Sequence, residues 1–358
     1  MPDRPDPAPD PAPDSAPEEG PAAVHRLRGA ATAPGPLPGT DPREALRTVF
    51  GELGEAPHAP SLPQLPARGP GADATGRTAA LLVELPVDLQ PAGWRFVDRP
   101  GRDVERARSF LRADLDELAE AAQDWRGPLV VRVLGPWSLL AAVELPRGER
   151  SVSDAGARRD VAASLAEGVA AHVADVRRLV PGADVLVQLD EPSLPAVLAG
   201  RLPTQSGYGT LRAVEEPEVR AVLSALVDAV RAAGAGAVLR LPAQETPWPL
   251  ARSCGADALA VDVSGLGDAG WESVAATVES GVRLWAELLA ARAAPPPVPE
   301  AVDALRVPWR RVGLPAADLA DVVVAPAGGP AGLPPAAVRP LLGRLRAVAA
   351  AVLESSGD

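Results

Sequence analysis

Two adjacent acids, Asp190 and Glu191, stand at the end of an apolar run and are followed at once by Pro192. Side chains of adjacent strand residues point to opposite faces, but the turn that the proline sets lets both carboxylates reach the same edge. A carboxylate there can bind an amine or act as a general base. The other interpretation is structural: such an acid caps the next helix or pairs with an arginine.

Three further residues have types that suit binding. Asp262 ends the apolar run Ala258–Val263, where it could bind a cation or substrate, or cap the turn through Ser264. Tyr208 is the only tyrosine and lies in a Gly-rich loop, where it either contacts a ligand or packs. Trp94 follows another strand end, where an aromatic surface suits stacking on a flat ring, with core packing as the alternative.

The histidines and the single cysteine offer little chemistry. His25 lies at the edge of an N-terminal tail, His58 in the Pro-rich loop Ala56–Pro66, and His172 in mid-helix, so we predict structural or surface roles for all three. Cys254 is predicted to be a buried packing residue, and one cysteine excludes both a disulfide within the chain and a cysteine-rich metal site. No Ser-His-Asp or Cys-His arrangement can be assembled from the spacing.

Short apolar runs, each followed by an amphipathic stretch, must position these residues. The predicted strands are Leu81–Leu85, Leu129–Leu134, Asp184–Leu189, Ala237–Leu241, Ala258–Val263 and Val322–Val324, with Ala33–Pro38 and Gly281–Leu288 as weaker candidates. Nearly continuous apolar runs are typical of parallel strands that are buried on both faces. The predicted helices include Val104–Ala122, Asp160–Leu179, Glu216–Ala233 and Val338–Leu353.

This alternation, repeated about eight times over roughly 320 residues, predicts a (β/α)8 TIM barrel rather than a doubly wound sheet. No Gly-x-Gly-x-x-Gly follows the first strand, which argues against a dinucleotide-binding fold. Functional groups of a barrel sit at the C-terminal ends of its strands. Asp190, Glu191 and Asp262 all fall at such ends.

Composition sets the remaining limits. Residues 1–24 are rich in Pro, Ala and Asp, which predicts a disordered tail before a barrel over residues 25–358. The formal charge is −12 and no basic stripe is visible, so we expect no nucleic-acid partner. No apolar run reaches the roughly 20 residues of a membrane span, and no secretory signal is visible, so we expect a cytoplasmic protein without a membrane partner. The sequence contains no lysine, which excludes Schiff-base and P-loop mechanisms.

Three segments carry a resemblance to a known family: residues 37–45 (LPGTDPREA), 84–95 (ELPVDLQPAGWR) and 188–195 (QLDEPSLP). Together they resemble the C-terminal catalytic domain of cobalamin-independent methionine synthase, particularly its single-domain actinobacterial versions. The resemblance runs from about Ala31 to the C-terminus. It implies a barrel that transfers a methyl group from 5-methyltetrahydrofolate to homocysteine, with zinc as the cofactor that activates the thiol.

The resemblance also implies residue roles. Asp190 matches the acid that holds the amino group of homocysteine. Glu191, Trp94 and Tyr208, which are chosen for their residue type and position, complete the predicted substrate-binding set. Homocysteine or methionine and a folate are therefore the implied small-molecule partners.

The zinc ligands that the family uses are largely missing. A His-x-Cys pair falls on Arg240 and Pro242, and the last cysteine falls on Gly328, so Asp262 is the only match. One acid cannot hold a tetrahedral zinc ion. We therefore predict that zinc is not bound, and the sequence assigns no catalytic residue.

Three hypotheses stay open. The chain is an active methionine-synthase-like methyltransferase, or it is a degenerate, zinc-free relative that binds a small amino acid, a pterin or a partner without this transfer. The third is a zinc-independent barrel enzyme that uses Asp190, Glu191 and Asp262 for other chemistry. The missing ligands favour the second hypothesis.

Overall fold

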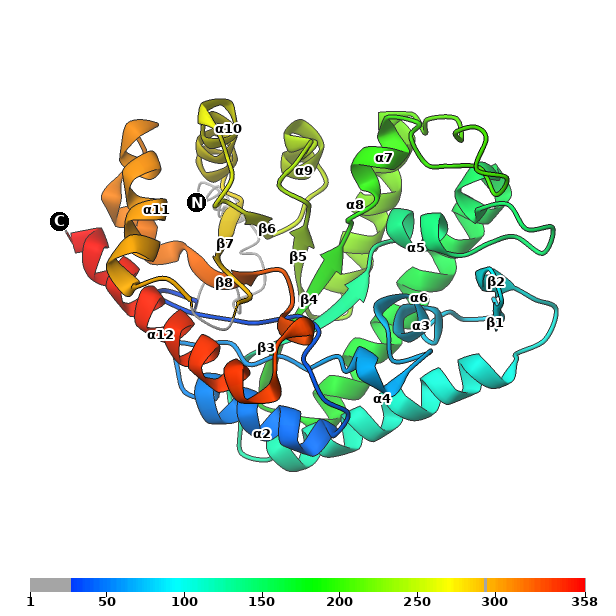
Figure 1. Cartoon of the computed structure of the whole chain (residues 1–358), viewed down its shortest axis with the longest axis horizontal. Coiled ribbons are helices and arrows are strands. Elements are labelled where there is room, and N and C mark those ends of the chain that lie inside the picture. The colour runs from blue at the N-terminus through cyan, green and yellow to red at the C-terminus, as the bar shows by residue number, and fades with distance from the viewer. Residues whose placement is uncertain (1–26, 293–294, 358) are drawn as a thin grey trace, which may run out of the picture.

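The structure, a computed structural model, describes residues 27–292 and 295–357, so the predicted tail at residues 1–24 lies outside the described residues. Six parallel strands form the central sheet, in the same order as in the chain (Figure 1). They are β3 (Gly127–Leu134), β4 (Ala183–Asp190), β5 (Gly236–Arg240), β6 (Ala258–Asp262), β7 (Arg283–Ala290) and β8 (Val323–Ala327). A separate antiparallel hairpin pairs β1 (Val87–Gln90) with β2 (Gly93–Phe96).

Helices surround the curled sheet (Figure 1). The α-helices are α2 (Pro42–Leu53), α3 (Ala74–Ala79), α4 (Arg102–Ala121), α5 (Pro136–Ala142), α6 (Ala155–Leu179), α7 (Leu194–Leu198), α8 (Glu216–Ala232), α9 (Trp248–Ser253), α10 (Asp268–Glu279), α11 (Val298–Arg311) and α12 (Val338–Glu354). The short 3₁₀ helices are η1 (Pro66–Arg68), η2 (Ser151–Ser153), η3 (Ala316–Asp321), η4 (Pro330–Gly332), η5 (Pro335–Ala337) and η6 (Ser355–Gly357). The predicted helices at residues 104–122, 160–179, 216–233 and 338–353 are confirmed as α4, α6, α8 and α12.

Two short segments close the ring between the edge strands β8 and β3. Their parallel backbone bridges join Ala31 to Val324, Thr32 to Ala59, Pro36 to Gln64, and Ser61 to Val130. Both segments are rich in proline, which has no N–H to donate, so they make isolated bridges in place of continuous ladders. The six strands and these two segments together supply eight strand positions around the ring, which confirms the predicted (β/α)8 barrel.

Strands β3 to β8 all fall on predicted runs, but the strand predicted at Leu81–Leu85 is wrong. Glu84 has a φ of 58°, which an extended strand does not allow. The N–H and C=O of Val83 both bond to the hydroxyl of Ser164 on α6, at 2.9 and 2.7 Å. The second strand position of the barrel, between the segment that begins at Ala31 and β3, is instead taken by part of Ala56–Pro66. These residues were predicted to be a loop.

The side chains inside the barrel form an apolar layer below a charged one. The apolar layer contains Val130, Leu186, Val238 and Trp285, all fully buried. Side chains two residues apart on a strand share a face, so the next inward side chains on these four strands are Arg132, Gln188, Arg240 and Glu287. A charged cluster therefore fills the C-terminal half of the barrel above an apolar plug.

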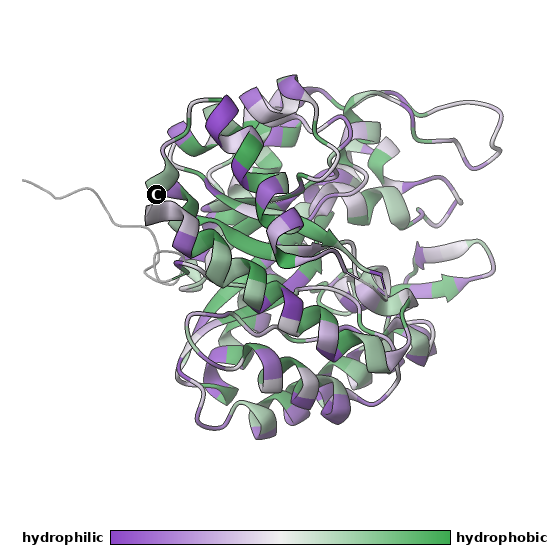
Figure 2. Ribbon diagram, turned by 60° about the vertical axis from the view of Figure 1, so that its left-hand side comes forward, coloured by the Kyte–Doolittle hydropathy of each residue, from purple (hydrophilic) through white to green (hydrophobic). Residues whose placement is uncertain are grey.

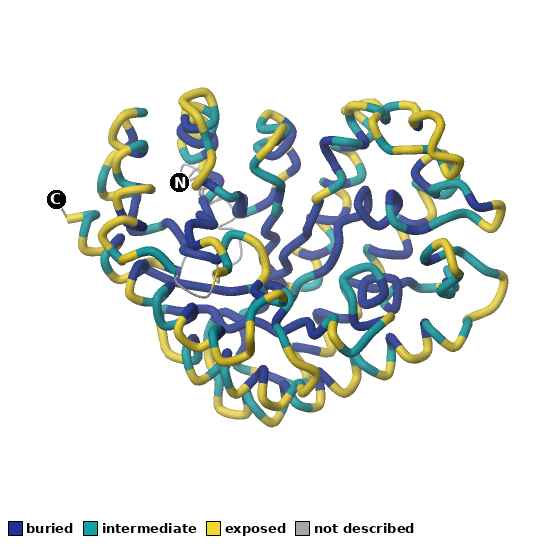
Figure 3. Tube along the Cα trace, in the orientation of Figure 1, coloured by how far each residue is buried: buried dark blue, intermediate teal, exposed yellow. Residues whose placement is uncertain are grey.

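The outer surface follows the expected pattern. Figure 2 shows apolar residues concentrated on the strands and polar residues on the outward faces of the helices. Figure 3 shows the strands buried and the loop between α7 and α8 exposed. No helix in the described part of the chain has the length and apolar character that crossing a membrane requires.

Candidate functional site

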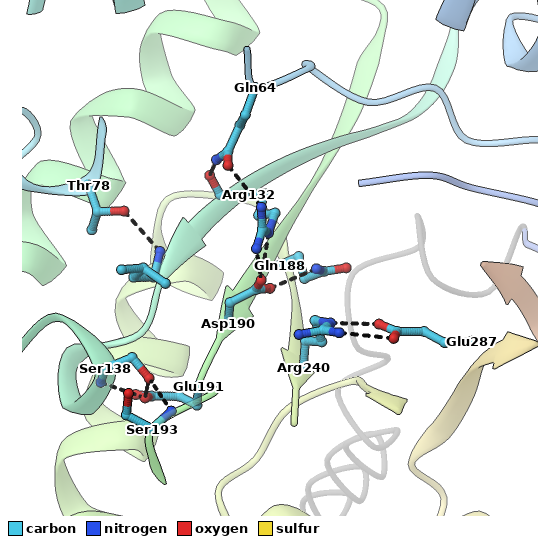
Figure 4. Close-up of polar contacts among 11 residues, drawn as sticks. Gln64, Thr78, Arg132, Ser138, Gln188, Asp190, Glu191, Ser193, Arg240 and Glu287 are labelled. Atoms are coloured by element: carbon cyan, nitrogen blue, oxygen red, sulfur yellow. Dashed lines mark hydrogen bonds and ion pairs between the residues drawn. The ribbon is translucent and has the colours of Figure 1, made fainter. Parts of the chain in front are cut away.

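The first half of the charged cluster is built around Asp190, at the end of β4 (Figure 4). Its Oδ2 accepts from Arg132 Nε at 2.5 Å, and Arg132 Nη2 contacts the same oxygen. Its Oδ1 accepts from Gln188 Nε2 at 2.7 Å. Arg132 Nη1 also donates to Gln64 Oε1 at 2.9 Å, which ties the second barrel segment to β3. The Asp190 carboxylate is thus fully buried and held by the protein's own donors.

The second half is the ion pair between Arg240 on β5 and Glu287 on β7. The guanidinium donates two hydrogen bonds to the carboxylate, from Nε to Oε1 at 2.6 Å and from Nη2 to Oε2 at 3.0 Å. Burial lowers the pKa of Arg240, but the bonds to Glu287 and the nearby charges of Asp190 and Asp262 outweigh it and raise the pKa. Burial raises the pKa of Glu287, and the bonds from Arg240 oppose this rise. Arg240 is therefore a permanent cation in the barrel mouth.

A pocket with a cavity volume of about 190 Å³ lies at the barrel mouth beside this charged cluster. Its walls include Pro36 from the first segment, Arg132, Gln188, Arg240, Glu287 and Gly328. Gly329 must be a glycine here, because a Cβ on it would lie 2.2 Å from Pro36 Cδ. The first segment and the end of β8 therefore meet closely and form one wall of the pocket.

Glu191 leaves the barrel and serves a different structure. Its Oε1 accepts from the backbone N–H of Trp137 at 2.9 Å, and its Oε2 accepts from the N–H and the hydroxyl of Ser138 at 2.8 and 2.7 Å. Glu191 thereby caps the first turn of α5, a structural role, but α5 follows β3 and is not the next helix in the chain that the structural interpretation named. Burial raises the pKa of Glu191 to about 7 even though the bonds from Ser138 and Trp137 lower it.

The four positions that the resemblance assigned to zinc do not all meet. Arg240 and Gly328 line the same pocket. Asp262 is the register neighbour of Glu287, and its Oδ1 accepts from the N–H and the hydroxyl of Ser264 at 2.9 and 2.6 Å, so it caps the turn. Pro242 lies beyond the pocket walls, where its carbonyl accepts from Thr246 Oγ1 at 2.5 Å.

The donor chemistry at these positions does not fit zinc. Arg240 is a cation, Gly328 has no side chain, and Pro242 offers only a carbonyl oxygen that is already bonded. Within residues 27–292 and 295–357, no three His, Cys, Asp or Glu side chains gather as a metal-ligand set. Zinc sites use about four ligands drawn from Cys, His and carboxylates, so we derive no step through a metal.

Tyr208 and Trp94 lie apart from the charged cluster. Tyr208, in the loop between α7 and α8, is 98% exposed and is not part of the pocket wall. Trp94 on β2 is buried, and its indole lies so close to α3 that a Cβ on Gly76 would be 2.7 Å from it. The structure therefore does not bring these two predicted binding residues into the wall of this pocket.

Sequence reasoning missed the roles of Arg132, Gln188 and Glu287. Each is a polar residue inside an otherwise apolar strand. Each lies two positions after an apolar residue that faces the barrel interior, so its side chain points to the same face. A charged side chain on the inward face of a buried strand needs a partner there. That signal was available in the sequence, but the partner that each residue meets was not.

The structure as a whole is similar to known barrels. It superposes on a B12-independent methionine synthase from Shewanella sp. W3-18-1 in complex with selenomethionine with a TM-score of 0.57 and 12% sequence identity, covering 90% of this chain and 97% of that one. A beta-mannanase from a symbiotic protist of the termite Reticulitermes speratus aligns with a TM-score of 0.45 and 11% identity, over 89% of this chain and 88% of that one. No protein-family profile and no curated protein sequence matches the chain. The likeness to the synthase establishes a shared fold, so function must be argued from the site.

Proposed function

We propose that this chain is a zinc-free relative of the B12-independent methionine synthases, and that it binds a small amino acid at the barrel mouth without transferring a methyl group to homocysteine. The observation that carries the proposal is the ion pair of Arg240 with Glu287. It puts a fixed cation where the resemblance calls for the first zinc ligand. A guanidinium cannot ligate Zn²⁺, and the residues that line the pocket include no imidazole or thiolate that could replace it.

The pocket suits a small zwitterion in size and charge. Its volume of about 190 Å³ is well below that of a site for a drug-sized ligand. Arg132, Arg240 and Glu287 line it, and Asp262 lies beside Glu287, so groups of both signs are within one short ligand's reach. An amino acid carries the matching carboxylate and ammonium groups.

A pterin fits this pocket less well. Flat rings are held by stacking on aromatic side chains, and the residues that line this pocket include none. Methyl transfer from 5-methyltetrahydrofolate needs both a folate and an activated thiol. The donor chemistry at the site supports neither requirement.

The proposal is tested with purified full-length protein. After equilibration with zinc and dialysis, elemental analysis should give far less than one zinc ion per chain. Calorimetry should show binding of methionine or homocysteine, and no methionine should form from homocysteine and 5-methyltetrahydrofolate. Stoichiometric zinc, or methionine production, would overturn the proposal, and so would the failure of both amino acids to bind.

A matched pair of variants locates the binding site. Arg240→Lys keeps a charge beside Glu287 but loses the planar fork, so we expect the affinity for the amino acid to fall at least about tenfold. Arg231→Lys is the control, because Arg231 on α8 pairs with Asp257 outside the pocket. Equal affinities of the two variants would move the binding site away from the barrel mouth.

A further inference from the structure

The acids of the barrel mouth are already bonded to the protein. Both oxygens of Glu287 accept from Arg240, and both oxygens of Asp190 accept from Arg132 and Gln188. Asp190 is also fully buried and does not line the pocket. A ligand that offers only an ammonium group therefore has to compete with these bonds.

The unused capacity of the pocket is mainly for donating hydrogen bonds. Arg240 Nη1 meets no acceptor among the described residues, because the bonds to Glu287 use Nε and Nη2. Each Nη of a guanidinium carries two N–H groups, so Arg132 retains a second N–H on both of its Nη atoms. The backbone N–H groups of Gly328 and Gly329 also have no acceptor within the described chain.

Each guanidinium is already paired with one carboxylate, so the free N–H donors of the pocket select a ligand that offers acceptor oxygens. Carboxylates match the planar fork of a guanidinium and form short, charge-assisted bonds with it. Asp262 does not line the pocket, is partly exposed to solvent, and has one oxygen bonded to Ser264. A ligand's amino group would face this acid, where water competes with it.

We infer that the carboxylate group of the ligand is the determinant of binding, held by the guanidinium of Arg240 with Arg132 beside it, and that the amino group is dispensable. The ligand class is therefore small carboxylic acids, of which amino acids are one part. The inference rests on the proposed function for the location of the pocket. It differs in the group recognised, because the resemblance gives recognition of the amino group to Asp190.

Three probes of one carbon skeleton test the inference by calorimetry on the full chain. They are methionine, the same acid without its amino group, and the same amine without its carboxyl group. We expect the two acids to bind within about tenfold of each other and the amine to bind at least about tenfold more weakly than either.

The outcomes separate the two proposals. Binding of methionine and the amine, with weak binding of the amine-free acid, overturns the carboxylate inference and leaves the proposed function standing. Binding of the amine-free acid alone supports the inference and overturns amino acid binding. Binding of none of the probes overturns both.

A matched pair of variants at Gly328 tests the same inference inside the pocket. Gly328 has a φ of 73°, and a Cβ placed on it meets no atom within 4 Å. Asp and Asn are the residues that adopt this backbone conformation most readily. Gly328→Asp puts a competing carboxylate beside the arginines, whereas Gly328→Asn adds the same bulk without charge.

We expect the affinity for the amine-free acid to be at least about tenfold lower in Gly328→Asp than in Gly328→Asn. Equal affinities, or tighter binding of the acid to Gly328→Asp, would overturn the inference. Circular dichroism of both variants shows whether the fold is kept. If either variant fails to fold, the ranking of the three probes on the unmodified chain decides.

Discussion

Asp190 and Glu191 are neighbours in the chain, and both are fully buried, but they are buried in different surroundings. Asp190 faces the barrel interior, where Arg132 supplies a formal positive charge and Gln188 supplies an amide donor. Glu191 faces the start of α5, where its donors are two backbone N–H groups and one hydroxyl, all neutral. A charged donor therefore stabilises the acid in the barrel interior, whereas neutral dipoles at the start of α5 stabilise the other acid.

The Glu191 side of this comparison shows the limit of neutral donors. Three hydrogen bonds lower the pKa of Glu191, and burial still raises it to about 7. Hydrogen bonds from uncharged groups therefore do not fully replace the water that a carboxylate loses. Asp190 belongs to the charged layer that shapes the pocket, whereas Glu191 fastens the end of β4 to α5, the helix that follows the neighbouring strand β3.

Removing the charge beside Asp190 should have the largest effect. Arg132→Met leaves the buried carboxylate with Gln188 as its remaining side-chain donor, so we expect the free energy of unfolding to fall by about 3–5 kcal/mol. Urea titration followed by tryptophan fluorescence measures the loss. Adding Asp190→Leu should restore part of it, because the unpaired charge is then gone.

The control for this variant is Arg178→Met. Arg178 pairs with Asp175 at 2.9 Å, and both side chains are exposed, at 67% and 52%. Exposed pairs contribute about 0–1 kcal/mol. Similar losses in the two variants would show that burial does not distinguish the Arg132–Asp190 pair.

The next effect is the pH dependence that Glu191 contributes. Its folded pKa of about 7 lies above its ordinary value of 4.5, so the folded chain keeps a proton that the unfolded chain has released. This stabilisation is fully present below pH 4.5 and is lost as the pH rises through 7. We expect the free energy of unfolding of the unmodified chain to fall by about 3 kcal/mol relative to that of Glu191→Gln across this window.

Urea titrations at a series of pH values measure this difference. Glu279→Gln, at an exposed position at the end of α10, serves as the control and should follow the unmodified chain. Parallel curves for the unmodified chain and Glu191→Gln would mean that Glu191 binds its proton equally in the folded and the unfolded chain, and this side of the comparison would fail.

The smallest expected effect comes from removing one hydroxyl group beside Glu191, that of Ser138. Ser138 Oγ donates to Glu191 Oε2 at 2.7 Å and accepts from the N–H of Ser193 at 3.0 Å. Ser138→Ala breaks both bonds, so we expect a loss of about 1–2 kcal/mol. The pKa of Glu191 should also rise further, which moves the pH window for stability upward.

Ser273→Ala is the matched control for this variant. The hydroxyl of Ser273 is exposed and bonds to the carbonyl of Ala269 within its own helix, at 2.9 Å. Its removal should change stability by less than about 0.5 kcal/mol. If the pH window of stability does not move in Ser138→Ala, the hydroxyl of Ser138 does not influence the pKa of Glu191.

The sequence predicted a strand correctly at most of the runs of apolar side chains. The runs at residues 129–134, 184–189 and 258–263 became β3, β4 and β6, since continuous apolar strands have to be covered on both faces. The segment that begins at Ala59 was not readable, because its prolines give it the composition of a loop. Its place in the ring depends on backbone bridges to the first segment, at Thr32, and to β3, at Val130.

The sequence by itself determined the barrel, the acids at the end of β4, and the absence of histidine and cysteine from the predicted zinc positions. Local composition and spacing are enough for these, because each depends on residues close in the chain. Only the tertiary structure decided which charges meet. Arg240 and Glu287 are 47 positions apart, and they bond because the curled sheet turns the inward faces of β5 and β7 toward a common centre.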